Sequence, residues 1–73
     1  MTHRIVAELV GTVHSVMVAP GDDVAEGDTI VVLESMKMEI PVLTEVAGRV
    51  GEVSVATGDN VRDGDVLAVV EEA

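Results

Sequence analysis

The chain has 73 residues, a formal net charge of −10, no cysteine and no aromatic residue. A chain of this length forms one domain, residues 1–73, which buries only about 60% of the surface that its unfolded form exposes. Disulfides are excluded, and the two histidines, His3 and His14, have no ligand partners at metal-site spacing. Without aromatic stacking platforms, and with so much negative charge, we expect no nucleic-acid partner and no membrane partner.

The core must be aliphatic, and valine, with 17 copies, dominates it. Valine is stiff about its first side-chain torsion and suits a pleated sheet better than a helix. The segment Met1–Arg4 leads into only a short apolar stretch before Glu8, which predicts neither a signal peptide nor a spanning helix. These features together predict an all-β protein of the cytoplasm.

The chain contains an internal repeat. When the sequence is shifted by 37 residues, Glu8–Glu34 lies over Glu45–Glu71, and 13 of the 27 aligned positions are identical. Each copy, about residues 8–34 and 45–71, is too small to bury its apolar face alone. We therefore expect the two copies to pack around one core with approximate two-fold symmetry.

Each copy begins with a strand, over Thr12–Val18 in the first and Arg49–Val55 in the second. The apolar alternation slips once in both strands, because Val13 and Val16 are three residues apart where a regular strand would place two. The same slip recurs in the second copy, so the sequence predicts a β-bulge or sharp bend at this point of each strand.

Glycine–aspartate turns follow each first strand and precede a second one. The four pairs are Gly21-Asp22, Gly27-Asp28, Gly58-Asp59 and Gly64-Asp65. Such pairs supply left-handed or side-chain-bonded turn geometry, and they lack the ligand spacing of a calcium loop. The second strands are expected over Thr29–Leu33 and Val66–Val70. Short strands separated by glycine turns favour a sandwich or flattened barrel.

The segment Ser35–Glu39 lies between the copies and has no counterpart in either. It joins the strand that ends at Leu33 to a new one over Ile40–Leu43, and so short a connection predicts a hairpin with a solvent-facing tip. Lys37 should occupy its apex, at the opposite end from the chain termini. The segment lacks the Asn-Gly or Asp-Gly pair of the commonest hairpin turn, which leaves the turn type open.

Lys37 is the only lysine of the chain. A lysine amine on a protruding turn can carry a group through an amide bond, and its long stem extends the reach of that group. The alternative is an acidic protein that simply uses arginine elsewhere. Met36 and Met38 offer adaptable apolar surface to a partner, although their spacing alone favours packing back onto the sheet. His14 is expected to be an exposed, neutral strand residue, and no catalytic constellation is present.

The run Glu34-Ser35-Met36-Lys37-Met38-Glu39 resembles the biotinylation motif of biotin carboxyl carrier domains, whose hallmark is Met-Lys-Met around the modified lysine. The glycine, valine and aspartate framework of both copies is similar to the biotin/lipoyl attachment family from end to end. Ser35 replaces the more usual alanine, and the thumb insertion of some carriers is absent. The resemblance implies a flattened β-barrel/sandwich hybrid of two four-stranded antiparallel sheets with quasi-two-fold symmetry, and Lys37 on a hairpin tip.

The resemblance also implies a non-catalytic carrier, similar to small stand-alone biotin/lipoyl attachment proteins. A biotin protein ligase would join biotin to Lys37, and the swinging arm would carry a carboxyl group from a biotin carboxylase to a carboxyltransferase of the acyl-CoA carboxylase type. By analogy, Met36 and Met38 support ligase recognition and the reactivity of biotin, while Glu34, Ser35 and Glu39 complete the cofactor-binding set.

Two alternatives to a biotin carrier are open. Lipoyl domains share the fold and often have a glutamate three residues before the lysine, as Glu34 is, but their lysine usually follows aspartate and precedes alanine. Lipoate is therefore the second candidate for the cofactor on Lys37. The other alternative is an unmodified barrel-sandwich interaction module, which would not need an exposed Met-Lys-Met tip.

Overall fold

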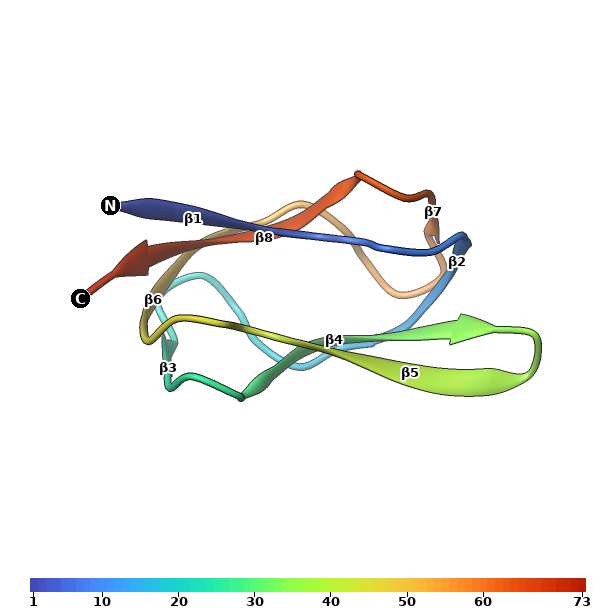
Figure 1. Cartoon of the computed structure of the whole chain (residues 1–73), viewed down its shortest axis with the longest axis horizontal. Helices are drawn as coiled ribbons and strands as arrows, with labels where there is room; N and C mark the ends of the chain where they lie inside the picture. Colours follow the sequence, from blue (N-terminus) through green and yellow to red (C-terminus); the bar gives the residue numbers. More distant parts are fainter.

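All 73 residues are described by the computed structural model, which consists of eight strands joined by turns. The strands are β1 Thr2–Val6, β2 Gly11–Val16, β3 Asp23–Val24, β4 Thr29–Ser35, β5 Met38–Leu43, β6 Gly48–Val53, β7 Asn60–Val61 and β8 Val66–Glu72. They form two antiparallel four-stranded sheets, in the orders β1-β8-β6-β3 and β5-β4-β2-β7 (Figure 1). This confirms the predicted all-β fold. No helix that could cross a membrane is found.

The internal repeat appears in the structure as symmetry between the sheets. A shift of 37 residues carries β1 onto β5, β2 onto β6, β3 onto β7 and β4 onto β8, so that one sheet order becomes the other. The central strands β4 and β8 share the same alternation of buried and half-buried residues. We call β1-β8-β6-β3 the terminal sheet, because it holds both chain ends, and β5-β4-β2-β7 the lysine sheet.

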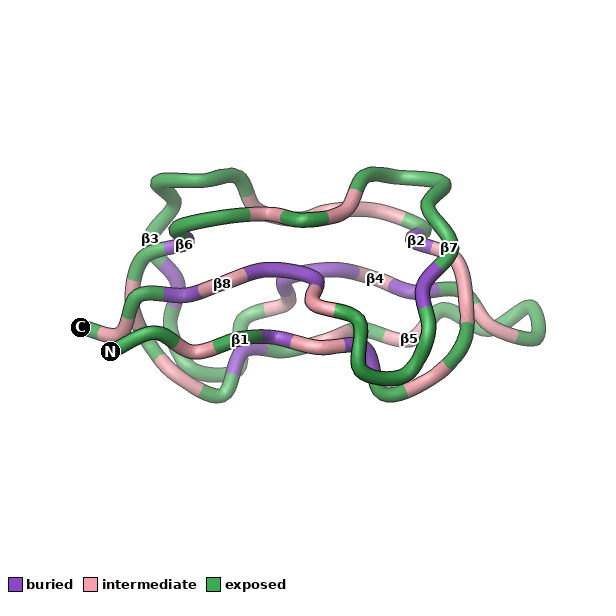
Figure 2. The backbone as a smooth tube through the Cα atoms, turned by 90° about the horizontal axis from the view of Figure 1, so that it is seen from above, coloured by how far each residue is buried: buried purple, intermediate pink, exposed green.

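The core lies between the two sheets and is aliphatic, as the composition predicts. Twelve buried hydrophobic residues form one cluster, in which Ile30, Leu33 and Leu67 are the largest completely enclosed side chains. Half of the twelve come from the central strands β4 and β8 (Figure 2). One polar residue, Thr44, is also buried, and its hydroxyl donates to the Val46 carbonyl at 2.7 Å. Burying a hydroxyl without such a partner would be costly.

Both predicted irregularities are β-bulges. The register of β2 on β4 shifts between Val13 and Ser15, and that of β6 on β8 shifts between Val50 and Glu52. The expected strand over Thr12–Val18 is two residues too long at its end, as is its copy, because the chain bends toward the next turn. The second strands are longer than expected, since pairing in β4 and β8 continues past the core.

The four glycine–aspartate turns share one geometry. Their glycines have φ between 92° and 95°, a region that side-chain-bearing residues rarely adopt. In each turn the aspartate carboxylate accepts a hydrogen bond of 2.8 to 2.9 Å from the backbone N–H three residues earlier. The acceptors are Asp22, Asp28, Asp59 and Asp65. The aspartates are therefore side-chain-bonded turn residues, as predicted.

Candidate cofactor-attachment site

The hairpin between β4 and β5 ends in a two-residue turn formed by Met36 and Lys37. Ser35 and Met38 are the last paired residues, and φ is 52° at Met36 and 65° at Lys37. Positive φ at both central residues is the requirement of a type I′ turn, which matches the twist of the strands it connects. The tip projects at the far end of the molecule from both termini (Figure 1). The predicted position of Lys37 is thereby confirmed, and the turn type is resolved.

The sequence of this turn is unfavourable for its geometry. Left-handed backbone costs a residue with a Cβ roughly 1–2 kcal/mol, and type I′ turns strongly prefer Asn-Gly. Met36 and Lys37 are the only non-glycine residues of the chain with positive φ. Strain of this kind gathers at functional positions, where the surrounding structure enforces it. Here the paired strands β4 and β5 hold the turn, and its residues are better explained by their side chains than by their backbone preference.

The methionines on either side of Lys37 are exposed. Met36 is 91% exposed and Met38 63%. The expectation from spacing, that they pack back onto the sheet, is wrong. The turn extends beyond the last core residue of β4, Leu33, so neither thioether has a buried surface to reach. Together with the lysine they form a solvent-facing apolar knob.

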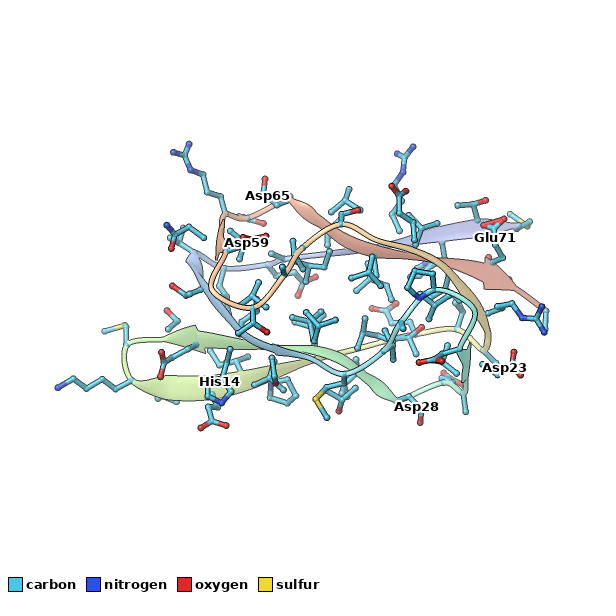
Figure 3. The ribbon with its side chains drawn as sticks, turned by 180° about the vertical axis from the view of Figure 1, so that it is seen from behind. His14, Asp23, Asp28, Asp59, Asp65 and Glu71 are labelled. Carbon is cyan, nitrogen blue, oxygen red and sulfur yellow. The ribbon has the colours of Figure 1, made fainter.

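Two carboxylates lie at the base of this knob. Glu34 and Glu39 are directly opposite each other on β4 and β5, and both are exposed. Glu39 Oε1 is 3.8 Å from Nε2 of His14, which comes from the bulge of β2 and is exposed as predicted. Figure 3 shows His14 at the end of the molecule that carries the lysine hairpin. The proximity of His14 to the motif was missed from the sequence, although the valine slip at the bulge marks the position that brings it there.

The surface around Lys37 is open. None of the three surface hollows of the molecule is lined by the lysine or by its neighbouring methionines. The first, of about 540 Å³, lies between the edge strands β1 and β5 and is lined by residues such as Ile5, Ile40 and Pro41. A group joined to the Lys37 amine is therefore held out in solvent on a flexible stem, free to enter a site on another protein.

The internal repeat allows this turn to be compared with the equivalent place in the other half of the chain. The counterparts of Ser35 and Met38 are Glu72 and Met1, which sit side by side at the chain ends, with the Glu72 N–H donating to the Met1 carbonyl at 2.7 Å. The two ends of the barrel are thus alike in strand pairing. They differ in the presence of the Met36-Lys37 turn at one of them, so the lysine is an addition to a symmetric frame.

A symmetric β-barrel that presents one lysine on an exposed turn defines a class of small carrier-type folds. The profile of the family described as "Biotin-requiring enzyme" matches residues 2–70, and the chain belongs to this biotin/lipoyl attachment family.

Relatives are found in Mycolicibacterium and Mycobacterium species. Over 43 residues the chain is 58% identical to the "Biotinylated protein TB7.3 homolog" of Mycolicibacterium smegmatis, which covers 59% of this chain and 61% of that protein. The "Biotinylated protein TB7.3" of Mycobacterium tuberculosis is 54% identical over 43 residues, with the same coverage. The chain thus matches about three-fifths of the length of these relatives.

Solved structures of large carboxylases contain a similar domain. Urea carboxylase of Kluyveromyces lactis matches 97% of this chain with a TM-score of 0.91 and 31% identity, over 6% of its own length. A single-chain, multi-domain long-chain acyl-CoA carboxylase matches 99% of this chain with a TM-score of 0.92 and 36% identity, over 7% of its own length. The fold therefore recurs as a small part of much larger enzymes.

Proposed function

We propose that this protein is a biotin carrier, with biotin joined covalently to Lys37. The observation that carries the proposal is the only lysine of the chain, held between two exposed methionines at the apex of a strained hairpin. Support comes from the family, and from relatives whose names describe biotinylated proteins. The residues 1–73 then act as one attachment domain.

The role of the chain is to present Lys37 to the ligase and to carry the biotin attached to it. A biotin protein ligase forms an amide bond between the Lys37 Nζ and the carboxyl carbon of biotin, with release of a proton and of the leaving group on that carbon. When attached, biotin supplies a ring that accepts a carboxyl group from a biotin carboxylase and gives it up to a carboxyltransferase. The chain itself supplies the stem, the turn and the recognition surface around them, and it is a non-catalytic part of the system.

The residues present fit such a group. The open surface around the turn leaves room for an enzyme to enclose the side chain without unfolding the barrel. Met36 and Met38 give that enzyme apolar contact beside the amine, while Glu34, Ser35 and Glu39 form the polar base of the turn. A thioether is unbranched and adapts to differently shaped partners, which suits a knob that must enter several active sites.

Lipoate is the second candidate for the group on Lys37. The barrel and Glu34 suit either cofactor, but the methionines on both sides of the lysine favour biotin. The same methionines argue against an unmodified interaction module, because such a module gains nothing from strained backbone and exposed apolar side chains at its tip.

The test is the intact mass of the protein purified from its native host, for the natural chain and for Lys37→Arg. We expect a biotinyl increment on the natural chain and none on the variant. A lipoyl increment would replace biotin by lipoate, whereas an unmodified natural chain would contradict the carrier function. A biotinyl increment that persists in Lys37→Arg would contradict the assignment of the site.

A further inference from the structure

The outer faces of the two sheets differ, although the repeat relates them. Outward positions on each strand are those whose neighbours along the chain pack into the core, because successive side chains of a strand point to opposite faces. On the lysine sheet, Pro41 lies between Ile40 and Val42, and Val32 lies between the buried Val31 and Leu33. The repeat then supplies, for each outward residue, a counterpart at the same place on the terminal sheet.

The outer face of the lysine sheet has an apolar centre. Pro41, Val32 and Ser15 form one row across β5, β4 and β2, since both Pro41 and Ser15 pair with Val32. Further from the tip, Leu43 is 48% exposed and Met17 is 57% exposed, both large hydrophobic residues in contact with water. We call these positions, Met17, Val32, Pro41 and Leu43, the apolar patch.

The counterpart face of the terminal sheet is more polar at two of the four patch positions, whereas Val32 and Leu43 have the apolar counterparts Val69 and Val6. Where the lysine sheet has Pro41, Met17 and Ser15, the terminal sheet has Arg4, Ser54 and Glu52. Its polar side chains also satisfy one another, because the Thr2 hydroxyl donates to the Glu71 carboxylate at 2.9 Å. The fold therefore accepts polar residues at the positions equivalent to Pro41 and Met17, and the apolar side chains at these two positions are not required for folding.

The outer faces of the two sheets also differ in charge. The tip end of the lysine sheet carries Glu34 and Glu39 opposite each other, and the strands β5, β4 and β2 contain no arginine. The terminal sheet carries Arg4 and Arg49, the latter 3.3 Å from Asp23. A surface that complements the lysine sheet must be apolar over the patch and basic toward the tip. Exposed hydrophobic side chains gathered on one face of a small protein are typical of a protein–protein contact.

We propose that the apolar patch is the docking surface for the ligase that acylates Lys37, so that the ligase approaches over the lysine sheet and not over the terminal sheet. This inference rests on the proposed function. Among the enzymes that handle the arm, the ligase is the one that must bring the amine itself into its active site. It therefore encloses the turn and comes against the adjoining strands, whereas enzymes that act on the attached ring are kept further away by the length of the arm.

The experiment transfers residues from one half of the chain to the other. The double variant Met17→Ser/Pro41→Arg gives the lysine sheet the side chains that the terminal sheet already carries at equivalent positions. The matched control, Glu52→Gln/Ser54→Met, changes the charge by the same amount on exposed positions of the terminal sheet. Biotinylation by the purified ligase of the same organism is followed by intact mass, with thermal unfolding to verify the fold of each variant.

We expect kcat/KM for biotinylation to fall at least about tenfold in Met17→Ser/Pro41→Arg and to stay within about twofold in the control. Single Met17→Ser, at an exposed position, keeps the test valid if the double variant is unfolded, and we expect about a threefold loss. Addition of unlabelled ligase to isotope-labelled Lys37→Arg should shift amide resonances of β5, β4 and β2 in preference to those of β1, β8 and β6.

Equal kcat/KM for the natural chain and the patch variants would overturn the docking inference while leaving the carrier function intact. The same holds if the variants are biotinylated normally but no longer accept carboxyl groups from the carboxylase, because a different enzyme would then occupy the patch. Failure of the natural chain to be biotinylated at all would overturn both proposals, and the native mass measurement separates that outcome from the others.

Discussion

Glu34 and Glu39 face each other directly across β4 and β5, immediately behind the turn that holds Lys37. At the equivalent place in the other half of the chain, Glu71 faces Thr2, and a hydrogen bond of 2.9 Å joins them. Like charges directly opposite each other destabilise an antiparallel pair. The chain thus keeps an unfavourable arrangement at the lysine end where its own repeat shows a favourable one.

Replacement of Glu39 by threonine should therefore stabilise the protein. The variant removes the repulsion with Glu34 and recreates the Thr2–Glu71 pairing, and we expect the free energy of unfolding to rise by about 0.5 kcal/mol. Denaturant unfolding at low salt measures the effect, which should shrink as salt screens the charges. Glu52→Thr on the terminal sheet is the control for simple loss of one negative charge. An equal gain in the control would contradict the pairwise explanation.

The left-handed turn at Met36 and Lys37 should respond to a change of turn residues. Met36→Asn/Lys37→Gly supplies the preferred type I′ pair, and we expect the free energy of unfolding to rise by about 1 kcal/mol. For a domain of this size that corresponds to a melting temperature higher by about 4–8 °C. Lys37→Arg, which keeps a side chain at positive φ, should have the same melting temperature as the natural protein. An unchanged melting temperature in the double variant would contradict the strain at the turn.

The close approach of β2 to β4 at Gly11 should make any side chain at this position destabilising. A Cβ there would lie 2.6 Å from the carbonyl oxygen of Glu34, so a backbone strand would have to move. We expect Gly11→Ala to lower the free energy of unfolding by about 1–3 kcal/mol. Gly51→Ala is the control, because a Cβ at that bulge position meets nothing nearer than 3.4 Å. Equal thermal stability of the two variants would contradict the contact.

The aspartates of the four turns should contribute through their carboxylate hydrogen bonds. Asp59 accepts a hydrogen bond of 2.9 Å from the Ala56 N–H, and Asp59→Ala removes it. We expect a loss of about 1 kcal/mol, measured by denaturant unfolding. Asp59→Asn retains an acceptor oxygen and should recover most of the loss. If the asparagine variant were as unstable as the alanine variant, charge and not the hydrogen bond would be the cause.

Local patterns predicted the parts of the fold that depend on neighbours in sequence. The slip between Val13 and Val16 located the bulge of β2, and the glycine–aspartate pairs located the four turns. The first strand, Thr2–Val6, and the two-residue strands β3 and β7 were not predicted. They pair with β8, β6 and β2, which lie far away in sequence, so no local period marks them.

The candidate site was predictable in position and less so in detail. A short link between two apolar strands places Lys37 on a tip whatever residues surround it. The type I′ geometry was not predictable, because Met36 and Lys37 lack the residues that usually mark it. The exposure of Met36 and Met38 was also not predictable, since it depends on how far the hairpin extends beyond the core.

The hydrogen bond between Glu72 and Met1 fixes the two chain ends together at one pole of a molecule about 35 Å long, with Lys37 at the other pole. Anything joined to either end, whether a fluorescent tag, a surface anchor or a linker to a larger enzyme, would lie at the end of the molecule opposite Lys37 (Figure 1). A fusion at the N-terminus and a fusion at the C-terminus would then have the same effect, since both would leave the Lys37 hairpin accessible.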